Sequence, residues 1–284
     1  MARLKDLRRR IKSVQNTRKL TRTMEMVATA KSKRAQDFFR AVRAFGDSVA
    51  DALAAARTES QDPTPLERPG KGKVRGLWVV TANRGLCGGF NASVVRLARE
   101  EIARIRKGGF EPRLFVQGKK GQQAFRNLKI PFEPVSVARD DQPRLAEAEA
   151  LADRWIALAQ GGGLASMSSV STPFKPGAVP APEARALLPA EAGPPPKAKG
   201  APIFEPTLAA ALSALAPLSV ACEILGRMSA SAAAEQVARR VAMKSATDNA
   251  DDMVKTLTRA YNRARQAGIT QEIAEVVGGG MAVE

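Results

Sequence analysis

Apolar residues recur with a helical period near the end of the chain. In the closing stretch, Arg259–Val277, they are spaced by three and four residues, which predicts a helix with one apolar face. Counted from the turn before this stretch, the positions are Leu257, Tyr261, Ala264, Ile269, Ile273, Val276 and Val277. The glycines Gly278–Gly280 follow at once and predict the end of this helix. A helix of this kind has to bury its apolar face against a partner.

The segment with a matching length and period lies at the opposite end of the chain, in Leu4–Ala56. Its positions form two heptad runs: Leu4, Leu7, Ile11 and Val14, then Met24, Ala28, Lys31, Ala35, Phe38, Val42, Phe45 and Val49. The two runs are offset by three residues, which predicts a stammer that overwinds the supercoil between Val14 and Met24. Two such helices from the two ends of one chain predict an antiparallel coiled coil.

Between these helices the pattern changes to strands that alternate with shorter helices. The expected strands are Val74–Ala82, Arg113–Gln117, Phe132–Ala138 and, in a serine-rich stretch, Leu164–Thr172. The expected helices are Ala92–Arg106, Lys120–Asn127 and Pro143–Gln160. This alternation predicts an open, mostly parallel sheet of the Rossmann-like kind. The proline-rich stretch 173–202 is expected to be largely loop.

From Glu205 the chain is expected to be helical again, with Pro217 kinking or restarting the helix. As one helix, Glu205–Val277 would be roughly 110 Å long, so its last part should project beyond the beginning of its partner. The fold class is therefore mixed, a long antiparallel coiled coil with an inserted α/β domain. The expected parts are a helix in 1–58, an α/β domain in 74–188, a flexible linker in 189–204 and a helix in 205–284.

The composition adds charge and removes most catalytic chemistry. The net charge is +17 and the pI about 10.5, which implies an acidic partner. Residues 1–43 hold fourteen basic and three acidic residues, a net of +11. The chain has no histidine and only two cysteines, so we expect no metal site and no disulfide framework. No apolar run was expected to reach the roughly 20 residues of a membrane span.

The loop NRGLCGGFN, Asn83–Asn91, follows a strand and precedes a helix, as a dinucleotide-binding turn does. Its glycines Gly85, Gly88 and Gly89 do not have the G-x-G-x-x-G spacing, and no Lys-Ser/Thr pair follows them. The acidic residue expected after the second strand is Gln117 instead. We therefore interpret the glycines as structural, expect no cofactor, and read Cys87, which no histidine can activate, as a small apolar residue.

Three stretches resemble the gamma subunit of bacterial F-type ATP synthases. They are IKSVQNTRKLTRTMEMVATAK (Ile11–Lys31), the loop NRGLCGGFN, and the stretch from VAMKSATDNA (Val241–Ala250) to YNRARQAGITQEIAEVVGG (Tyr261–Gly279). They stand at the start, middle and end of the chain in the family's order. The resemblance implies a rotor shaft without catalytic residues of its own, which couples proton flow to ATP chemistry on the beta subunits.

The resemblance also implies partners and contact residues. The partners would be the ring of alpha and beta subunits, the epsilon subunit and the membrane c-ring, with the chain peripheral on the cytoplasmic face of the bacterial inner membrane. The residues implied to contact beta are Met24, Arg239, Arg265, Gln266, Thr270 and Glu272. Gln266 and Thr270 are four residues apart and share one helix face.

A basic coiled-coil protein that binds nucleic acid is the alternative from another class. It would explain the basic first helix through phosphate contacts. It does not explain the inserted α/β domain, and no aromatic residue interleaves with the basic cluster in Arg3–Arg22.

Overall fold

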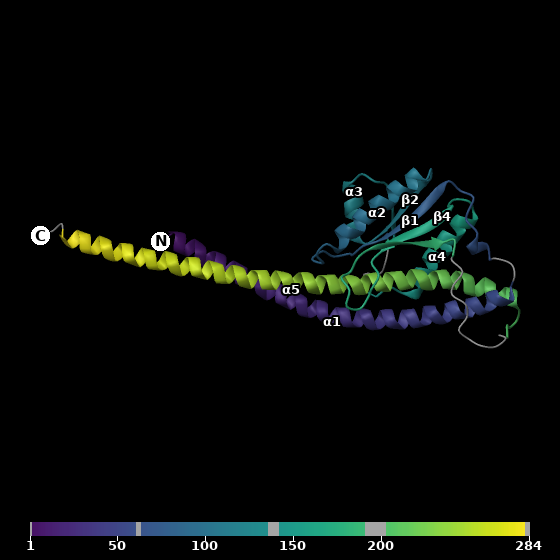
Figure 1. Cartoon of the computed structure of the whole chain (residues 1–284), viewed down its shortest axis with the longest axis horizontal. Helices are drawn as coiled ribbons and strands as arrows, with labels where there is room; N and C mark the ends of the chain where they lie inside the picture. Colours follow the sequence, from purple (N-terminus) through teal and green to yellow (C-terminus); the bar gives the residue numbers. More distant parts are fainter. Residues whose placement is uncertain (1, 61–63, 136–141, 191–202, 282–284) are drawn as a thin grey trace. The chain divides into compact units, whose positions relative to one another are not determined.

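The computed structural model describes residues 2–60, 64–135, 142–190 and 203–281 of the chain. These residues divide into two compact units, Met1–Ala28 with Arg240–Glu284, and Thr29–Arg239. Two long helices, α1 (Ala2–Glu59) and α5 (Leu208–Met281), contribute to both units (Figure 1). Each unit is described by itself below.

The first unit is an antiparallel pair made of the beginning of α1 and the end of α5. Thr21 contacts Thr247, and Arg18 contacts Asp251, so the two helices run in opposite directions. The end of α5 continues past the N-terminal end of α1 (Figure 1). In this projecting part Ile269 and Ile273 are 47% and 59% exposed. The prediction that the second helix outreaches the first is confirmed.

The buried face of α1 keeps one heptad phase, so the predicted stammer is wrong. Its most buried positions recur every seven residues and are Thr21, Ala28, Ala35, Val42, Val49 and Ala56. Thr21 and Ser32 are buried on this face although the sequence pattern did not include them, because it counted apolar residues. Phe45, assigned to the apolar face from its side chain, is 44% exposed. The inner face is continuous because small and hydroxyl side chains fill it.

The second unit contains a five-stranded sheet in the order β3-β2-β1-β4-β5. Its strands are β1 (Val74–Val80), β2 (Glu111–Gln117), β3 (Glu133–Val135), β4 (Ser166–Ser171) and β5 (Glu183–Leu188). The pairs among the first four strands are parallel, and β5 is antiparallel to β4. The predicted mostly parallel sheet is confirmed, and β5 is a strand that the proline-rich pattern did not predict. A short 3₁₀ helix, Pro65–Glu67, lies in the connection before β1.

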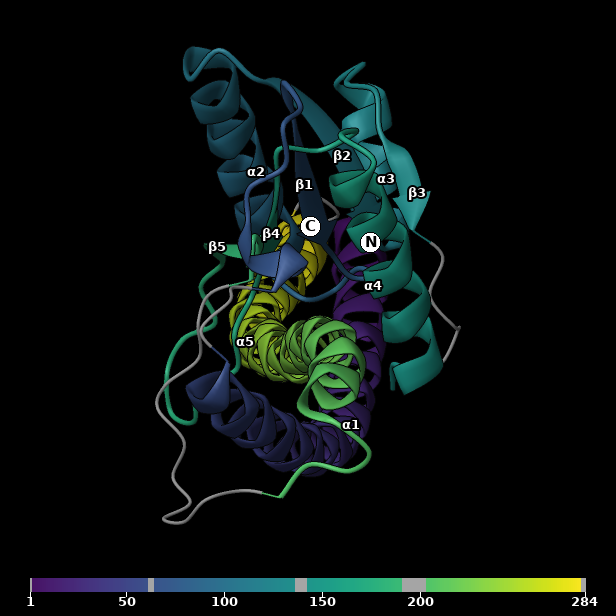
Figure 2. The same cartoon turned by 90° about the vertical axis from the view of Figure 1, so that its right-hand side faces the viewer.

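Helices cover both faces of this sheet (Figure 2). Helices α2 (Phe90–Lys107) and α3 (Lys119–Asn127) pack on one face, where Leu77 and Val79 of β1 point. On the other face Trp78 and Val80 pack with α4 (Leu145–Gln160) and with parts of α1 and α5 of the same unit. The alternation of side chains along β1 therefore serves two cores, as expected for a strand buried on both sides.

Helix α5 differs from its prediction at two places. Pro217 lies inside the helix and does not restart it, so of the two expected effects only a kink stays a prediction. The neighbouring Ala216 and Val220 are buried in the core. The glycines Gly278–Gly280 do not stop it either, and the helix runs to Met281. Glycine weakens a helix by about 1 kcal/mol per residue, but its backbone can adopt helical angles.

One stretch of α5 is more apolar than the sequence analysis expected when it found no run long enough for a membrane span. By length and composition alone this helix could cross a membrane, with a mean hydropathy of 1.9 in its most apolar window. A third of that window is buried. Leu212, Leu215 and Val220, near the beginning of α5, pack in the core with Trp78. The beginning of α5 therefore contributes to the core, and the expectation that no stretch is apolar enough to cross a membrane is wrong by length and composition. The linker expected in 189–204 and the last residues of the third expected strand lie largely outside the described residues.

Candidate functional site

The loop Asn83–Gly89 lies at the carboxyl end of β1, where the sheet changes its direction of growth. The chain proceeds from β1 to β2 on one side, while β4 pairs with the other side of β1. Open α/β sheets bind ligands in the crevice at such a point. The geometry of this loop therefore decides whether the second unit can hold a nucleotide.

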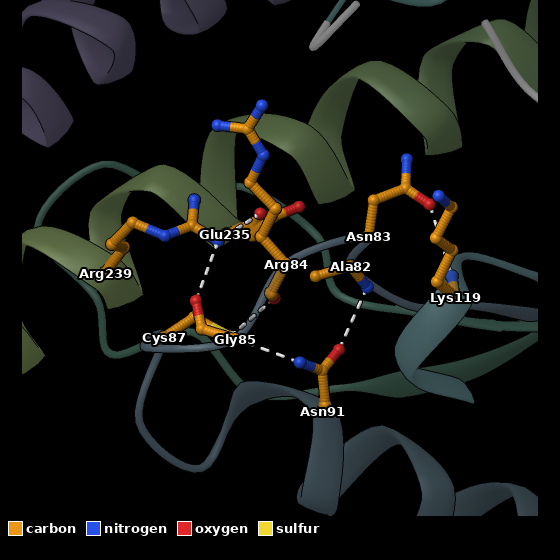
Figure 3. Close-up of polar contacts among 9 residues, drawn as sticks. All are labelled: Ala82, Asn83, Arg84, Gly85, Cys87, Asn91, Lys119, Glu235 and Arg239. Atoms are coloured by element: carbon orange, nitrogen blue, oxygen red, sulfur yellow. Dashed lines mark hydrogen bonds and ion pairs between the residues drawn. The ribbon is translucent and has the colours of Figure 1, made fainter. Parts of the chain in front are cut away.

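Polar side chains fix both ends of the loop (Figure 3). The Thr81 hydroxyl donates to the carbonyl oxygen of Gln117 at 2.7 Å, which ties the end of β1 to β2. The Asn91 amide oxygen accepts from the backbone N–H of Ala82 at 2.9 Å, and its amide nitrogen lies 3.2 Å from the Cys87 sulfur. The Asn83 side chain accepts from the backbone N–H of Lys119 at 3.2 Å. The loop is thus held by the first turns of α2 and α3.

The backbone of the loop requires glycine at one of its three positions. Gly88 has a φ of 59°, in the region that favours glycine. A Cβ at Gly85 would meet only the end of the Lys120 side chain at 3.6 Å, and one at Gly89 would meet nothing within 4 Å. Leu86, an ordinary residue, has a φ of 62° and is 60% exposed. The structural interpretation therefore rests on Gly88, and not on all three glycines.

Helix α5 packs against one side of this loop. Ala234 of α5 is completely buried against Ala82, Cys87 and Phe90. The Arg239 guanidinium donates to the carbonyl oxygen of Gly85 at 3.3 Å and to the Glu235 carboxylate at 2.6 Å (Figure 3). The side chains of Arg239 and Glu235 are 14% and 16% exposed. Helix α5 is therefore fixed to one side of the loop by an apolar contact and by Arg239.

Both cysteines are buried and unreactive in character. Burial raises the pKa of the Cys87 thiol, and the nearby Glu235 carboxylate raises it further, against the opposite effect of Arg239. Burial also raises the pKa of the Cys222 thiol, with a smaller contribution from Glu149. A raised pKa keeps the thiol protonated, and the protonated form is a poor nucleophile. The structure agrees with the interpretation of Cys87 as a packing residue.

The other predicted site residues belong to the first unit. Met24 is half-buried on α1, whereas Arg265, Gln266, Thr270 and Glu272 are exposed on α5. The Thr270 hydroxyl donates to the carbonyl oxygen of Gln266 at 3.0 Å, in agreement with the shared helix face.

The first unit does not bring Met24 to these α5 residues. Thr21, close to Met24, is opposite Thr247, which stands 18 residues before Arg265. At about 1.5 Å per residue this is roughly 27 Å along the helix. Any coupling between the two groups has to pass along the helices, not through a direct contact.

Two residues of the loop network were not singled out from the sequence. Glu235 stands four residues before Arg239, and oppositely charged residues at this spacing in a helix are expected to pair. The spacing could therefore have identified Glu235 from the sequence. Asn91 closes the motif NRGLCGGFN, and an amide at the start of a helix can bond to the preceding loop. Among the described residues there is no group of three His, Cys, Asp or Glu side chains that could hold a metal ion.

Comparison with known proteins gives one consistent family. A family model described as ATP synthase matches residues 3–283. The chain is 36% identical to the ATP synthase gamma chain of Leptospira biflexa and 39% identical to that of Gemmatimonas aurantiaca, in both cases over 100% of each chain. The ATP synthase gamma chain of a Synechococcus strain is 35% identical, over 100% of this chain and 99% of the relative.

Solved structures show the same fold at lower identity. A chain of the Euglena gracilis mitochondrial ATP synthase rotor has a TM-score of 0.67 at 16% identity, covering 94% of this chain and 99% of that one. A chain of the central stalk and c-ring of the Tetrahymena thermophila mitochondrial ATP synthase has a TM-score of 0.55 at 20% identity, covering 80% and 99%. Sequence and fold agree, and the chain belongs to the family of ATP synthase gamma chains.

Proposed function

We propose that this chain is the central rotor shaft of an F-type ATP synthase. In this role it couples proton flow through the membrane c-ring to ATP synthesis or hydrolysis on the beta subunits. Its membership in the gamma chain family supports the proposal, because bacterial relatives match it over their full length. The rotor and c-ring named for the structures of similar fold support the same assembly.

The observation that carries the proposal is the free end of α5. Beyond the N-terminal end of α1 this helix exposes Ile269 and Ile273 together with polar side chains. A helix that leaves isoleucines in water needs a partner to cover them, because burying such a side chain is worth about 1.5–3 kcal/mol. A ring of alpha and beta subunits that encloses the end of α5 would provide this cover.

The proposed contacts with beta follow from the same placement. Arg265, Gln266, Thr270 and Glu272 are exposed and can present charged and amide groups to a surrounding subunit. Met24 would contribute a second, separate contact on α1. Arg239 is the exception among the predicted contacts, because both acceptors of its guanidinium belong to its own chain. Its contact with beta stays a prediction.

We further propose that the chain is not itself catalytic and that the epsilon subunit is among its partners. Helix α5 packs against the loop after β1, and neither cysteine has a lowered pKa. Within the complex the chain would be peripheral on the cytoplasmic face of the bacterial inner membrane, in keeping with its bacterial relatives. We also propose that the chain has three functional parts: a coiled-coil helix in 1–58, an α/β domain in 74–188 and a second coiled-coil helix in 205–284.

Nucleic-acid binding explains less of the molecule. It accounts for the net charge of +11 in residues 1–43, but not for the α/β domain or the exposed end of α5. An acidic surface inside a protein ring would attract the same basic helix. The rotor function therefore accounts for both the charge and the exposed helix.

The test is assembly with the alpha and beta subunits encoded by the same genome. Co-expression should yield a complex that contains this chain and hydrolyses ATP, and the complex with its membrane sector should pump protons in vesicles. Alpha and beta subunits that assemble and hydrolyse ATP identically with and without this chain would contradict the proposal. Recovery of the chain only on nucleic acid, with no association with these subunits, would favour the alternative.

A further inference from the structure

Arg227 of α5 holds the antiparallel edge of the sheet through three hydrogen bonds from its two terminal nitrogens. Its Nη1 donates to the Ser169 hydroxyl of β4 and to the carbonyl oxygen of Arg185 at 3.3 Å. Its Nη2 donates to the carbonyl oxygen of Ala186 at 2.7 Å, and its Nε donates to the Glu223 carboxylate at 2.8 Å. Nη2 also lies 2.7 Å from the same Glu223 oxygen in an ion pair. All three guanidinium nitrogens therefore donate, in four hydrogen bonds.

The acceptors on β5 are available because the strand pairing is irregular. Met167 pairs with Leu188, whereas the next residue of β4, Ser168, pairs with Ala186. One residue of β5 is therefore extra, and such a bulge disrupts the ladder of hydrogen bonds. Arg227 binds the two carbonyl groups immediately before this extra residue. Arg227 thus attaches α5 to the part of β5 where the bulge interrupts the hydrogen bonds to β4.

The packing around Arg227 is open, which makes these hydrogen bonds more important. Two pockets open to solvent, of about 230 Å³ and about 540 Å³, are both lined by Arg227 and Glu223. Where side chains do not fill the space between α5 and β5, close packing cannot prevent these two elements from sliding past each other. The Arg227 side chain itself is only 10% exposed, because the groups that it binds surround it. The hydrogen bonds of Arg227 therefore connect α5 and β5 where their packing is loose.

We propose that Arg227 is a positioning residue that makes the α/β domain turn rigidly with the shaft helix. The inference rests on the proposed rotor function, because rigidity matters where torque passes between the domain and α5. Charge-assisted hydrogen bonds resist displacement in fixed directions, whereas the apolar core between the sheet and α5 is non-directional. Without Arg227 the β4–β5 edge is expected to yield under load before the shaft turns the beta sites.

The test measures torsional stiffness in the assembled complex of alpha, beta and this chain. A particle is attached to the exposed end of α2 through Lys107→Cys, and its angular spread is recorded while the complex pauses. Arg227→Met keeps the length of the side chain and removes its donors. The spread is expected to widen by about 1.5-fold or more, because four charge-assisted hydrogen bonds are lost. Arg227→Lys, with one donor group in place of the fork, should give an intermediate width.

Arg185→Met is the matched control, since it removes an arginine side chain from the same bulge but leaves the backbone acceptors of Arg227. Its side chain is 62% exposed and pairs with Glu183, so the width should stay that of wild type. ATP hydrolysis without load should be unchanged in all three variants. A variant that merely destabilised the chain would lower this activity as well. An Arg227→Met complex as stiff as wild type overturns the inference.

Failure to assemble is also accounted for. If the methionine variant does not assemble, Arg227→Lys decides, because it keeps the charge beside Glu223, and a wild-type width in it overturns the inference. If the wild-type complex itself shows no ATP-driven rotation, the proposed function fails first. A rotating wild type with unaffected variants leaves the rotor function intact and removes only the role of Arg227.

Discussion

The Arg239 guanidinium donates to the carbonyl oxygen of Gly85, which lies 154 residues earlier in the chain. The same group pairs with Glu235, so loss of Arg239 removes the donor to the Gly85 carbonyl and one ion pair of a largely buried carboxylate. Arg239→Met should lower the free energy of unfolding by about 1–3 kcal/mol and speed amide hydrogen exchange in Gly85–Gly89. Urea unfolding and hydrogen-exchange mass spectrometry check both. Arg240→Met, one residue along and exposed, should change neither.

The packing of α5 against the loop after β1 predicts that the isolated chain binds neither ATP nor NAD. Ala234 of α5 packs on Ala82 and Phe90 at the carboxyl end of β1, the end of such a sheet where ligands bind. Calorimetry should show no saturable heat up to about 1 mM ligand, a limit that corresponds to weak binding of roughly 4 kcal/mol. Saturable binding that disappears in Gly88→Ala would show that the loop is a nucleotide site after all.

Glycine at the loop is expected to matter at position 88 and not at position 85. Gly88 has a positive φ, so an added Cβ should cost about 1–2 kcal/mol of folding free energy. Gly85→Ala is the control, because its Cβ would make only an ordinary contact with Lys120. Urea midpoints of the two variants give the comparison. Equal losses would mean that the crowding of the loop, and not its backbone angles, requires glycine.

The sequence predicted most of the architecture because its signals were local and repeated. β1, β2 and the helices α2 to α4 agree closely with their expected positions, since each has several residues of one period. The missed β5, rich in alanine, follows a run of prolines and is paired with β4 through contacts that no local pattern encodes. The false stammer has the opposite cause, because Thr21 hydrogen-bonds to Thr247 inside the coiled coil and was not counted as a buried position.

The site was predictable only in part for a related reason. The motif NRGLCGGFN marked the loop, but its contact with Arg239 joins residues from the middle and the end of the chain. Composition could not separate the one glycine with a positive φ from its two neighbours. Arg227 has no motif at all, since its role arises from a bulge in the strand pairing. Long-range contacts of this kind become visible only when the chain is folded.

The cysteines are expected to be inert until alkaline pH. Because burial raises the pKa of Cys87 and Cys222, the folded chain keeps these protons while the unfolded chain loses them at the ordinary thiol pKa. Their stabilising contribution is therefore complete below the unfolded pKa, roughly 8.5, and is lost as the pH rises through the folded pKa. Stability curves of wild type and Cys87→Ser with Cys222→Ser should converge or cross only above that pH.

The same burial predicts that thiols do not regulate the complex. ATPase activity should be indifferent to dithiothreitol, and iodoacetamide should label the native chain far more slowly than the unfolded chain at neutral pH. A severalfold change of activity with dithiothreitol that is absent from Cys87→Ser or Cys222→Ser would show that a cysteine acts as a switch.

The exposed end of α5 predicts a residue-level requirement for coupling. Arg265→Ala with Gln266→Ala removes one guanidinium and one amide that face away from the coiled-coil partner, so the fold should keep its helical circular dichroism. If these groups bind beta, each contact contributes about 1.5–3 kcal/mol in the assembled complex, enough to change a stepwise cycle. ATP turnover or ATP-driven proton pumping should fall severalfold while assembly stays near normal.

The control is Asn262→Ala with Arg263→Ala, which removes the same kinds of group one turn earlier and should leave both activities close to wild type. Vesicles with each complex give hydrolysis and pumping in parallel, and a double variant at Arg265 and Gln266 that matches wild type in both would make this part of α5 a passive spacer.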